Sequence, residues 1–106
     1  MFYLTYVKKH ITLQGAKSVG GIPVGRAFLV LEHPKGRRVY VYPEEASAYE
    51  GVAYCHVTWR GGGFAIVGLP TLAVFVGQNP LPREIHEWLA EHLESVLVPA
   101  WIKLCE

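Results

Sequence analysis

One segment of the chain has the period of a helix, and it lies close to the C-terminus. From Pro82 to Leu97 the apolar residues recur every three or four positions, which predicts an amphipathic helix. Asn79 is suited to cap the start of this helix, and Pro99 is suited to end it. The predicted apolar face comprises Ile85, Trp88, Leu89, Leu93 and Val96. A long helix of this kind needs a second layer against which it can bury that face.

The segments before the helix have the pattern of strands. They alternate apolar and polar residues or form short apolar runs, and Gly and Pro separate them. His33-Pro34-Lys35-Gly36 predicts a turn, and Gly61-Gly62-Gly63 predicts a second hairpin. The predicted strands are Met1 to Lys8, which Ile11 to Leu13 extends or follows, Ala27 to Glu32, Arg37 to Tyr42, Val52 to Arg60, Phe64 to Val67 and Thr71 to Val76. Between them, Gln14 to Gly25 predicts a mobile loop or an irregular edge, and Pro43 to Gly51 predicts one or two helical turns.

This order predicts a single α+β domain over residues 1–106. We expect a mostly antiparallel sheet of about five to six strands, with one long C-terminal amphipathic helix packed on one face. The chain is 51% apolar and only 18% charged, against about 25% charged residues in typical proteins. Such a small domain should expose part of its apolar surface, so we expect a homo-oligomer, with a dimer as the commonest form. Trp101 and Leu104 of the apolar tail should pack on the domain or on a partner.

The amino-acid usage excludes several kinds of chemistry. The chain has nine acidic residues, and all of them are Glu, so neither a Ser-His-Asp triad nor an Asp-based metal site can be built. We therefore expect no metal and no cofactor. Scarce Asn, Gln and Met are typical of a protein from a thermophile. No apolar run approaches the roughly 20 residues of a membrane span, so we expect a cytoplasmic protein without a membrane partner.

Charge divides the chain into a basic and an acidic part. Residues 1–42 have a net charge of +6, and residues 43–106 have a net charge of −5. The basic part could bind an anionic partner, or the two parts could attract each other within or between protomers. Both interpretations stay open at this point.

Two of the predicted strands place Tyr, His and Arg side chains on common faces. Alternation puts Tyr54, His56, Thr58 and Arg60 on one face of the Val52 strand, and it puts Arg38, Tyr40 and Tyr42 on one face of the Arg37 strand. If both strands lie in one sheet, these residues form a binding surface. Aromatic and Arg side chains are enriched at dimer interfaces, and together they also bind single-stranded nucleic acid. A plain exposed sheet is the third interpretation.

His92 falls between Trp88 and Val96 on the apolar face of the predicted helix. A buried His can act as a base or a metal ligand, but more often it bonds to the backbone within a core or an interface. An enzyme based on His56, His92 or a Glu would need a concave pocket that collects these groups.

Cys55 and Cys105 match no zinc or redox motif. An intracellular protein of a hyperthermophile can contain disulfides. A bridge within the chain, a bridge between chains through Cys105, and two thiols are the alternatives.

A short stretch resembles the end of a thioredoxin. It comprises Gly68-Leu69-Pro70-Thr71-Leu72 with Phe75, followed by the amphipathic helix. In that family a cis-proline precedes a strand and the final helix, so the resemblance implies that Pro70 is cis. The Cys-x-x-Cys motif of the family is missing here, and redox activity does not follow from the resemblance.

These patterns lead to three hypotheses of function. The first is a non-enzymatic module that self-associates or binds a partner. The second is nucleic-acid binding by the basic, Tyr-rich N-terminal half, through Lys8, Lys9, Arg37, Arg38, Tyr40 and Tyr42. The third is a small enzyme with a His/Glu site.

Overall fold

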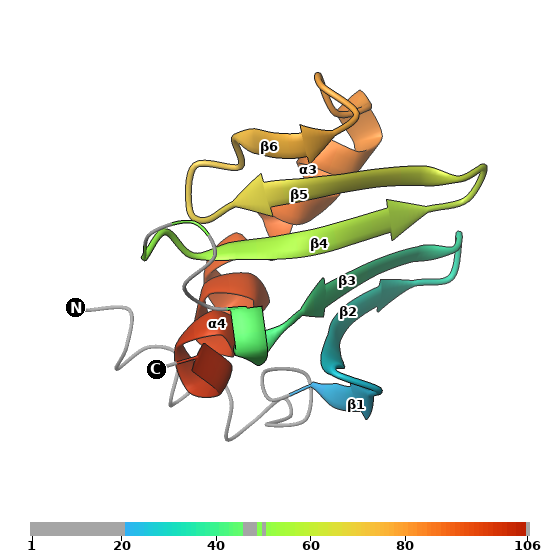
Figure 1. The fold of residues 1–106 in the computed structure, drawn as a ribbon. Coiled ribbons are helices and arrows are strands. Elements are labelled where there is room, and N and C mark those ends of the chain that lie inside the picture. The colour runs from blue at the N-terminus through green and yellow to red at the C-terminus, as the bar shows by residue number, and fades with distance from the viewer. Residues whose placement is uncertain (1–20, 46–48, 50, 106) are drawn as a thin grey trace.

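The computed structural model describes residues 21–45, 49 and 51–105. These residues form one six-stranded antiparallel sheet whose spatial order follows the sequence, from β1 to β6 (Figure 1). The fold class is therefore the predicted α+β, with an antiparallel sheet and a helical C-terminal segment. In chain order the elements are β1 (Ile22–Val24), β2 (Ala27–His33), β3 (Arg37–Val41), the 3-10 turn η1 (Pro43–Glu45), β4 (Tyr54–Trp59), β5 (Gly63–Gly68), β6 (Val74–Gly77), α3 (Arg83–Glu91), the π turn η2 (Leu93–Leu97) and α4 (Val98–Cys105).

The hairpin of β2 and β3 forms as its turn residues predict. The N–H of Gly36 donates to the carbonyl of His33 at 3.0 Å, and Gly36 adopts a φ of +83° that favours glycine. At the described end of Gln14 to Gly25 the structure has an edge and not a mobile loop, because Ile22–Val24 is a short strand at the sheet edge. Pro lacks the N–H of an inner strand, and the edge position of Pro23 accommodates this. The predictions for Met1 to Lys8 and Ile11 to Leu13 lie outside the described residues.

The second half of the sheet follows the prediction with shifted ends: β4 and β6 are shorter than predicted, and β5 extends one residue beyond each predicted end. β4 and β5 pair in continuous register from Tyr54 opposite Gly68 to Trp59 opposite Gly63. The last strand begins at Val74 and not at Thr71, because residues 69–71 form a turn in which the N–H of Leu72 donates to the carbonyl of Gly68 at 2.8 Å. The Leu69–Pro70 bond is cis. The resemblance to thioredoxins had implied this cis-proline. The sheet itself is a simple antiparallel meander throughout the described residues.

The predicted single helix is broken into two. α3 spans nine residues and ends at Glu91, and a π turn then leads into α4. The N–H groups of Val96 and Leu97 both donate to the carbonyl of His92 at 3.0 Å, which is the bonding expected where a turn widens.

The two predicted ends of that helix are also wrong. Pro99 does not end the helix, because it is the second residue of α4, where a missing N–H costs little. Asn79 does not cap the start either: Pro82 is the N-cap residue, and it makes no side-chain hydrogen bond. The helical segment therefore starts later than predicted and continues through the tail.

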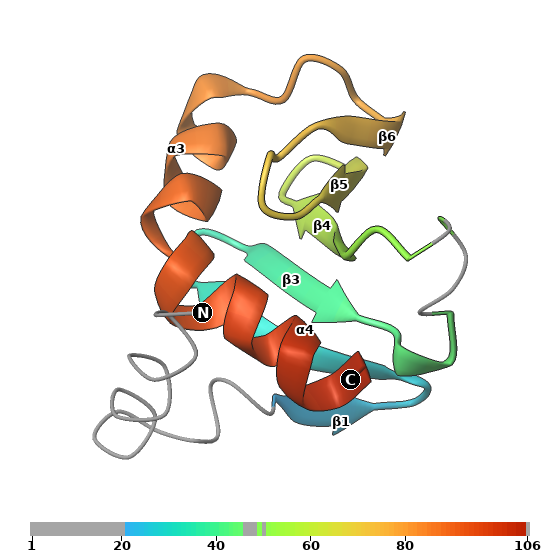
Figure 2. The ribbon, with the colours of Figure 1, turned by 90° about the vertical axis from the view of Figure 1, so that its left-hand side faces the viewer.

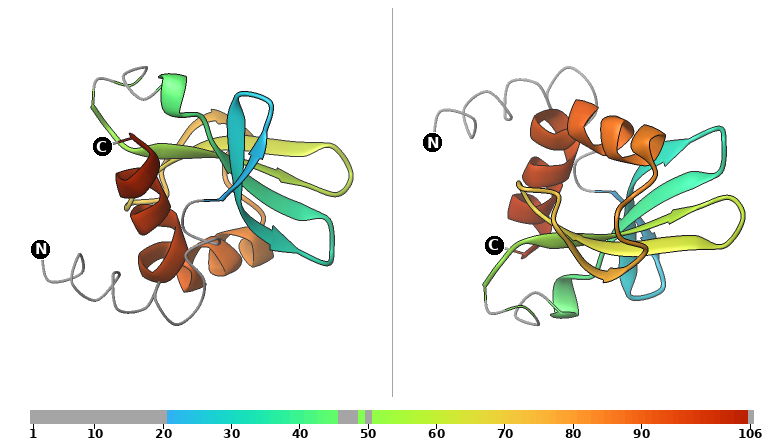
Figure 3. Two further views of the ribbon diagram at one scale, coloured as in Figure 1. Left: turned by 90° about the horizontal axis from the view of Figure 1, so that it is seen from below. Right: turned by 90° about the horizontal axis from the view of Figure 1, so that it is seen from above.

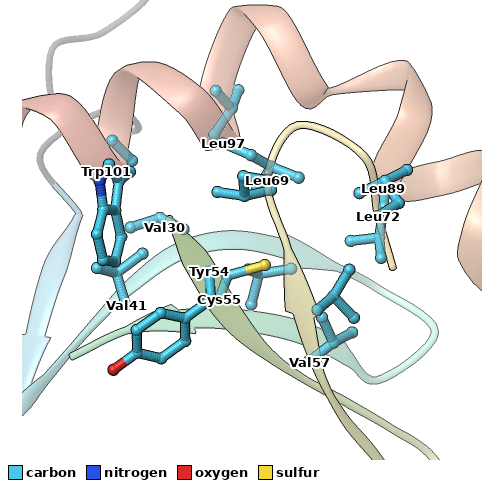
Figure 4. Packing of buried hydrophobic residues seen from close by; sticks show 14 of the residues in the cluster. Val30, Val41, Tyr54, Cys55, Val57, Leu69, Leu72, Leu89, Leu97 and Trp101 are labelled. Carbon is cyan, nitrogen blue, oxygen red and sulfur yellow. The ribbon is translucent and has the colours of Figure 1, made fainter. Parts of the chain in front are cut away.

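Both helices lie on one side of the sheet (Figures 2 and 3). Leu89 and Leu97 are fully buried, and Trp101 is 5% exposed, so the apolar tail packs on the domain as expected. In Figure 4 these three side chains point from the helical layer toward Leu69 and the strands. We call the opposite face the open face of the sheet, because the helical segments of the described chain reach it only at the start of β4, where Trp101 of α4 and Glu45 of η1 contact Tyr54. Among the described residues, no helix is both long and apolar enough to cross a membrane.

Candidate functional site

The register of the central strands brings most of the predicted surface residues together on the open face. Arg38 of β3 lies opposite Thr58 of β4, and Tyr40 lies opposite His56. Residues that pair across neighbouring strands project to the same side of a sheet. β3 and β4 are thus neighbours in one sheet, which was the condition of the sequence prediction.

The rings on this side of the sheet form a continuous chain of contacts. The centroids of Tyr42 and His56 are 4.3 Å apart, and those of His56 and Phe64 are 6.2 Å apart. The centroid of Tyr54 is 5.8 Å from that of His56 and 4.8 Å from that of Tyr49. The centroids of Tyr49 and Phe75 are 4.9 Å apart. We call this cluster the aromatic face: Tyr42, Tyr49, Tyr54, His56, Phe64 and Phe75. Offset and tilted ring pairs of this kind each add about 0.5–1.5 kcal/mol beyond the burial of their area.

Two phenylalanines leave the aromatic face partly open to solvent. Phe64 is 38% exposed and Phe75 is 37% exposed, while the neighbouring Val76 is 44% exposed. Phe75 occupies the irregularity in the pairing of β5 with β6, and its ring lies over Gly68, where a Cβ would collide with it. Phe64 and Phe75 lie toward opposite ends of β5, and a sheet face that exposes several large apolar side chains is typical of a contact surface.

Tyr54 belongs to the aromatic face but does not present a binding surface. It is only 1% exposed, and its hydroxyl donates to the backbone carbonyl of Glu45. Its ring packs on Trp101 of α4 with centroids 5.3 Å apart. Burial, together with the nearby Glu45 carboxylate, raises the pKa of Tyr54 to about 12. The prediction of Tyr54 as a binding residue is therefore corrected to a structural role, because the helical tail closes over it.

His56 lies at the centre of the aromatic face with an unsatisfied nitrogen. Its Nε2 is buried and has no hydrogen-bond partner, and Oε1 of Glu45 is 3.8 Å away. The side chain is 16% exposed. Burial lowers the pKa of His56, and the Glu45 carboxylate opposes that shift only in part. The imidazole is consequently neutral at pH 7 and adds no positive charge to the face.

Arg38, the arginine of the predicted set that lies on the open face, forms an ion pair. Nε of Arg38 donates to Oε2 of Glu32 at 3.0 Å, and both side chains are half exposed. A cation that is paired in this way has less charge to offer to a phosphate. The open face therefore combines exposed rings with the Arg38–Glu32 pair and with the Glu45 carboxylate beside the neutral His56.

Arg60 is separated from this surface, contrary to the prediction. β4 ends at Trp59 and the chain turns at Gly61, so strand alternation no longer applies to Arg60. Arg60 instead lines a cleft at the end of the sheet together with Lys35 and Arg37. The guanidinium of Arg37 lies 5.8 Å from the centroid of Trp88, on the helical side of the sheet. Lys8 and Lys9, which belong to the nucleic-acid hypothesis, lie outside the described residues.

His92 marks the junction between α3 and the π turn. Its Nδ1 is 3.0 Å from the carbonyl oxygen of Trp88, and the side chain is half-buried. The hydrogen bond to the backbone agrees with the interpretation of His92 as a structural histidine and not as a base or a metal ligand. The two clefts described in the structure are lined by other residues, so neither of them collects His56 and His92. No cluster of three metal-ligating side chains occurs within residues 21–45, 49 and 51–105.

The two cysteines are not bridged to each other. Cys55 is completely buried on the helical side of β4, and burial raises the pKa of its thiol to about 12. Cys105 is half-buried at the end of α4. Of the three alternatives, a bridge within the chain is not formed, because the two cysteines are not at disulfide distance. A bridge between chains stays a prediction.

Sequence reasoning missed Tyr49, Glu45, Phe64 and Phe75 as members of the site. Phe64 could have been found, since it alternates with buried residues of β5 and pairs with Thr58. Glu45 and Tyr49 come from the segment between β3 and β4, where no sequence period indicates which side chains turn toward the sheet.

Comparison with known proteins adds no assignment. A scan against protein-family models, a search of curated proteins and a search of solved structures found no match to this chain.

Proposed function

We propose that this protein is a non-enzymatic module that associates with a second copy of itself through the open face of its sheet. The observation that supports this proposal is the aromatic face, in which Phe64 and Phe75 stay more than one-third exposed beside closely packed rings. Aromatic side chains are enriched in interfaces and dominate their energetics.

The charge of the open face favours a second copy over a nucleic acid. In a two-fold symmetric dimer each patch meets itself, so an uncompensated charge would face a like charge. Arg38 is paired with Glu32 and His56 is held neutral by burial, whereas the Glu45 carboxylate beside His56 would repel a phosphate backbone. Binding of single strands needs cations next to the stacking rings, but Arg37 and Arg60 lie away from these rings. Nucleic-acid binding is therefore the weaker proposal.

The experiment places a negative charge on the open face and measures the mass in solution. Phe64→Glu and Phe75→Glu each replace an exposed ring, while Ala90→Glu adds the same charge on the exposed side of α3. We expect each Phe variant to weaken the dimer by at least about 2 kcal/mol, or roughly 30-fold in the dissociation constant. Sedimentation equilibrium over a range of concentrations measures that constant.

The outcome separates the open face from other contact surfaces. Ala90→Glu should leave the dissociation constant unchanged, and circular dichroism should show all three variants folded. Equal dissociation constants for the wild type and the two Phe variants would contradict an interface at the aromatic face.

A further inference from the structure

A second surface of the molecule combines a cleft with unpaired positive charge. The cleft has a volume of about 460 Å³ and lies where the turns of two hairpins approach the start of α3. Both turns extend from the same end of the sheet (Figure 1). Lys35 and Arg37 come from the first hairpin, Trp59 and Arg60 come from the second, and Glu84 comes from the helix. The volume falls within the roughly 300–1,000 Å³ typical of small-molecule sites.

The charges around this cleft are not balanced. Three cations line it, and Glu84 is the one acidic side chain among its lining residues. In the described part of the chain, neither Lys35 nor Arg37 nor Arg60 forms an ion pair, whereas Arg38 and Arg83 each pair with a glutamate at 3.0 Å. Like charges that converge on one hollow repel each other unless an anion lies between them.

The neighbouring His33 reports the same positive potential. Burial is the largest cause that lowers the pKa of His33, and the charges of Arg37 and Lys35 lower it further, while the Glu91 carboxylate opposes the shift. The imidazole also accepts a hydrogen bond from the backbone N–H of Lys35 at its Nδ1, at 3.1 Å. The local field thus disfavours any additional positive charge.

Three of the side chains that line the cleft, Arg37, Trp59 and Arg60, contact neighbouring parts of the fold. Arg60 lies against the turn of the first hairpin, with its Nε 3.2 Å from the position that a Cβ on Gly36 would take. Arg37 is held over the ring of Trp88. The indole of Trp59 occupies the space over Gly63, where any Cβ would collide with it. Groups that are ordered before binding lose less entropy when a ligand arrives.

We propose that this cleft binds the phosphate group of a small molecule. Arg and Lys side chains make the strong, charge-assisted hydrogen bonds that phosphate oxygens accept. The start of α3 contributes less than the three cations, because the N–H of Ile85 already donates to the carbonyl of Pro82 at 3.0 Å and the acidic Glu84 lies in the first turn. The cleft is separate from the aromatic face, so phosphate binding and self-association are independent of each other.

The experiment is titration calorimetry with two probes, inorganic phosphate and adenosine monophosphate, at constant ionic strength with chloride as the replaced anion. Lys35→Gln and Arg60→Gln each remove one cation from the cleft. Arg26→Gln is the matched control, because this exposed arginine lies in the turn at the other end of β2. We expect phosphate to bind with a dissociation constant below about 5 mM. Each cleft variant should weaken it at least roughly tenfold, and the control should change it less than about twofold.

The two probes distinguish a free phosphate from the phosphate of a nucleotide. If adenosine monophosphate binds more tightly than phosphate and Trp59→Leu abolishes only that difference, the ligand contains a base that contacts Trp59. If both probes bind equally, the cleft recognises the phosphate group alone. Absence of binding by both probes, or equal weakening by Arg26→Gln and the two cleft variants, would overturn the proposal. Thermal unfolding of each variant establishes that it is folded.

Discussion

Replacing His56 with Phe should make the protein more stable and less sensitive to acid. The buried Nε2 of His56 has no hydrogen-bond partner, and leaving such a group unsatisfied costs about 1–3 kcal/mol. Phe retains a ring beside Tyr42 and Phe64, which lie 4.3 and 6.2 Å from the imidazole centroid. We therefore expect His56→Phe to raise the free energy of unfolding at pH 7.5 by about 1 kcal/mol or more. Each kcal/mol should raise the Tm by roughly 4–8 °C.

The pH dependence of that stability tests the cause. Burial lowers the pKa of His56 below its ordinary value of 6.5, so the unfolded chain binds a proton there more readily than the folded protein does. The contribution of neutral His56 to the free energy of unfolding is therefore fully present above pH 6.5. It is lost as the pH falls from 6.5 through the pKa that His56 has in the folded protein. His33 has a lowered pKa as well, so His56→Phe should reduce the acid sensitivity and not remove it.

Urea unfolding at pH 7.5 and pH 5, at one protein concentration, measures both effects. The control is His56→Gln, which keeps a buried polar group but cannot titrate; it should lose the same part of the pH dependence without the gain in stability. The reasoning is refuted if His56→Phe is less stable than the wild type at pH 7.5, or if its stability falls with acid as steeply as that of the wild type.

Two further predictions follow from the packing of the sheet and the core. Gly77 has a φ of +98°, and a Cβ there would collide with the backbone of Phe64, while Gly62 has a φ of +84° with no atom near its Cβ position. Gly62→Ala should lower the free energy of unfolding by about 1 kcal/mol from the backbone conformation alone, and Gly77→Ala should lower it by more. Thermal unfolding of the two variants measures the difference. Equal losses would show that the close approach of Gly77 to Phe64 is unimportant. Cys55 is completely buried and its pKa is raised to about 12, so a thiol reagent should modify it only at the rate of unfolding, and rapid modification in native buffer would contradict its burial.

The sequence predicts the elements whose signals are local. The hairpin of β2 and β3 is an example, because Pro34 and Gly36 fit their turn positions independently of the rest of the fold. The face shared by Arg38, Tyr40 and His56 followed from alternation as soon as β3 and β4 were neighbours. These features depend on two or three adjacent residues, so they are visible in the chain alone.

The features that the sequence does not predict depend on contacts between distant segments. Pro99 has the appearance of a helix stop, but a π turn before it allows a second helix to start. Alternation along β4 puts Tyr54 on the same face as His56 and Thr58, but Tyr54 is buried because Trp101 packs over it. Arg60 lies away from the aromatic face because β4 ends at Trp59, one residue before the predicted end of that strand. In each case the tail or a turn decides the outcome, and neither has a period that points to its partner.

The mass of the purified protein in solution, measured by light scattering with and without reductant, tests the central proposal most directly. A chain of 11.8 kDa that pairs through its open face should have twice that mass at micromolar concentration. Because rings and not a disulfide hold the proposed pair, the mass should be the same in reductant. A mass of one chain at every concentration would contradict self-association, and a dimer that dissociates in reductant would place the contact at Cys105 instead of the aromatic face.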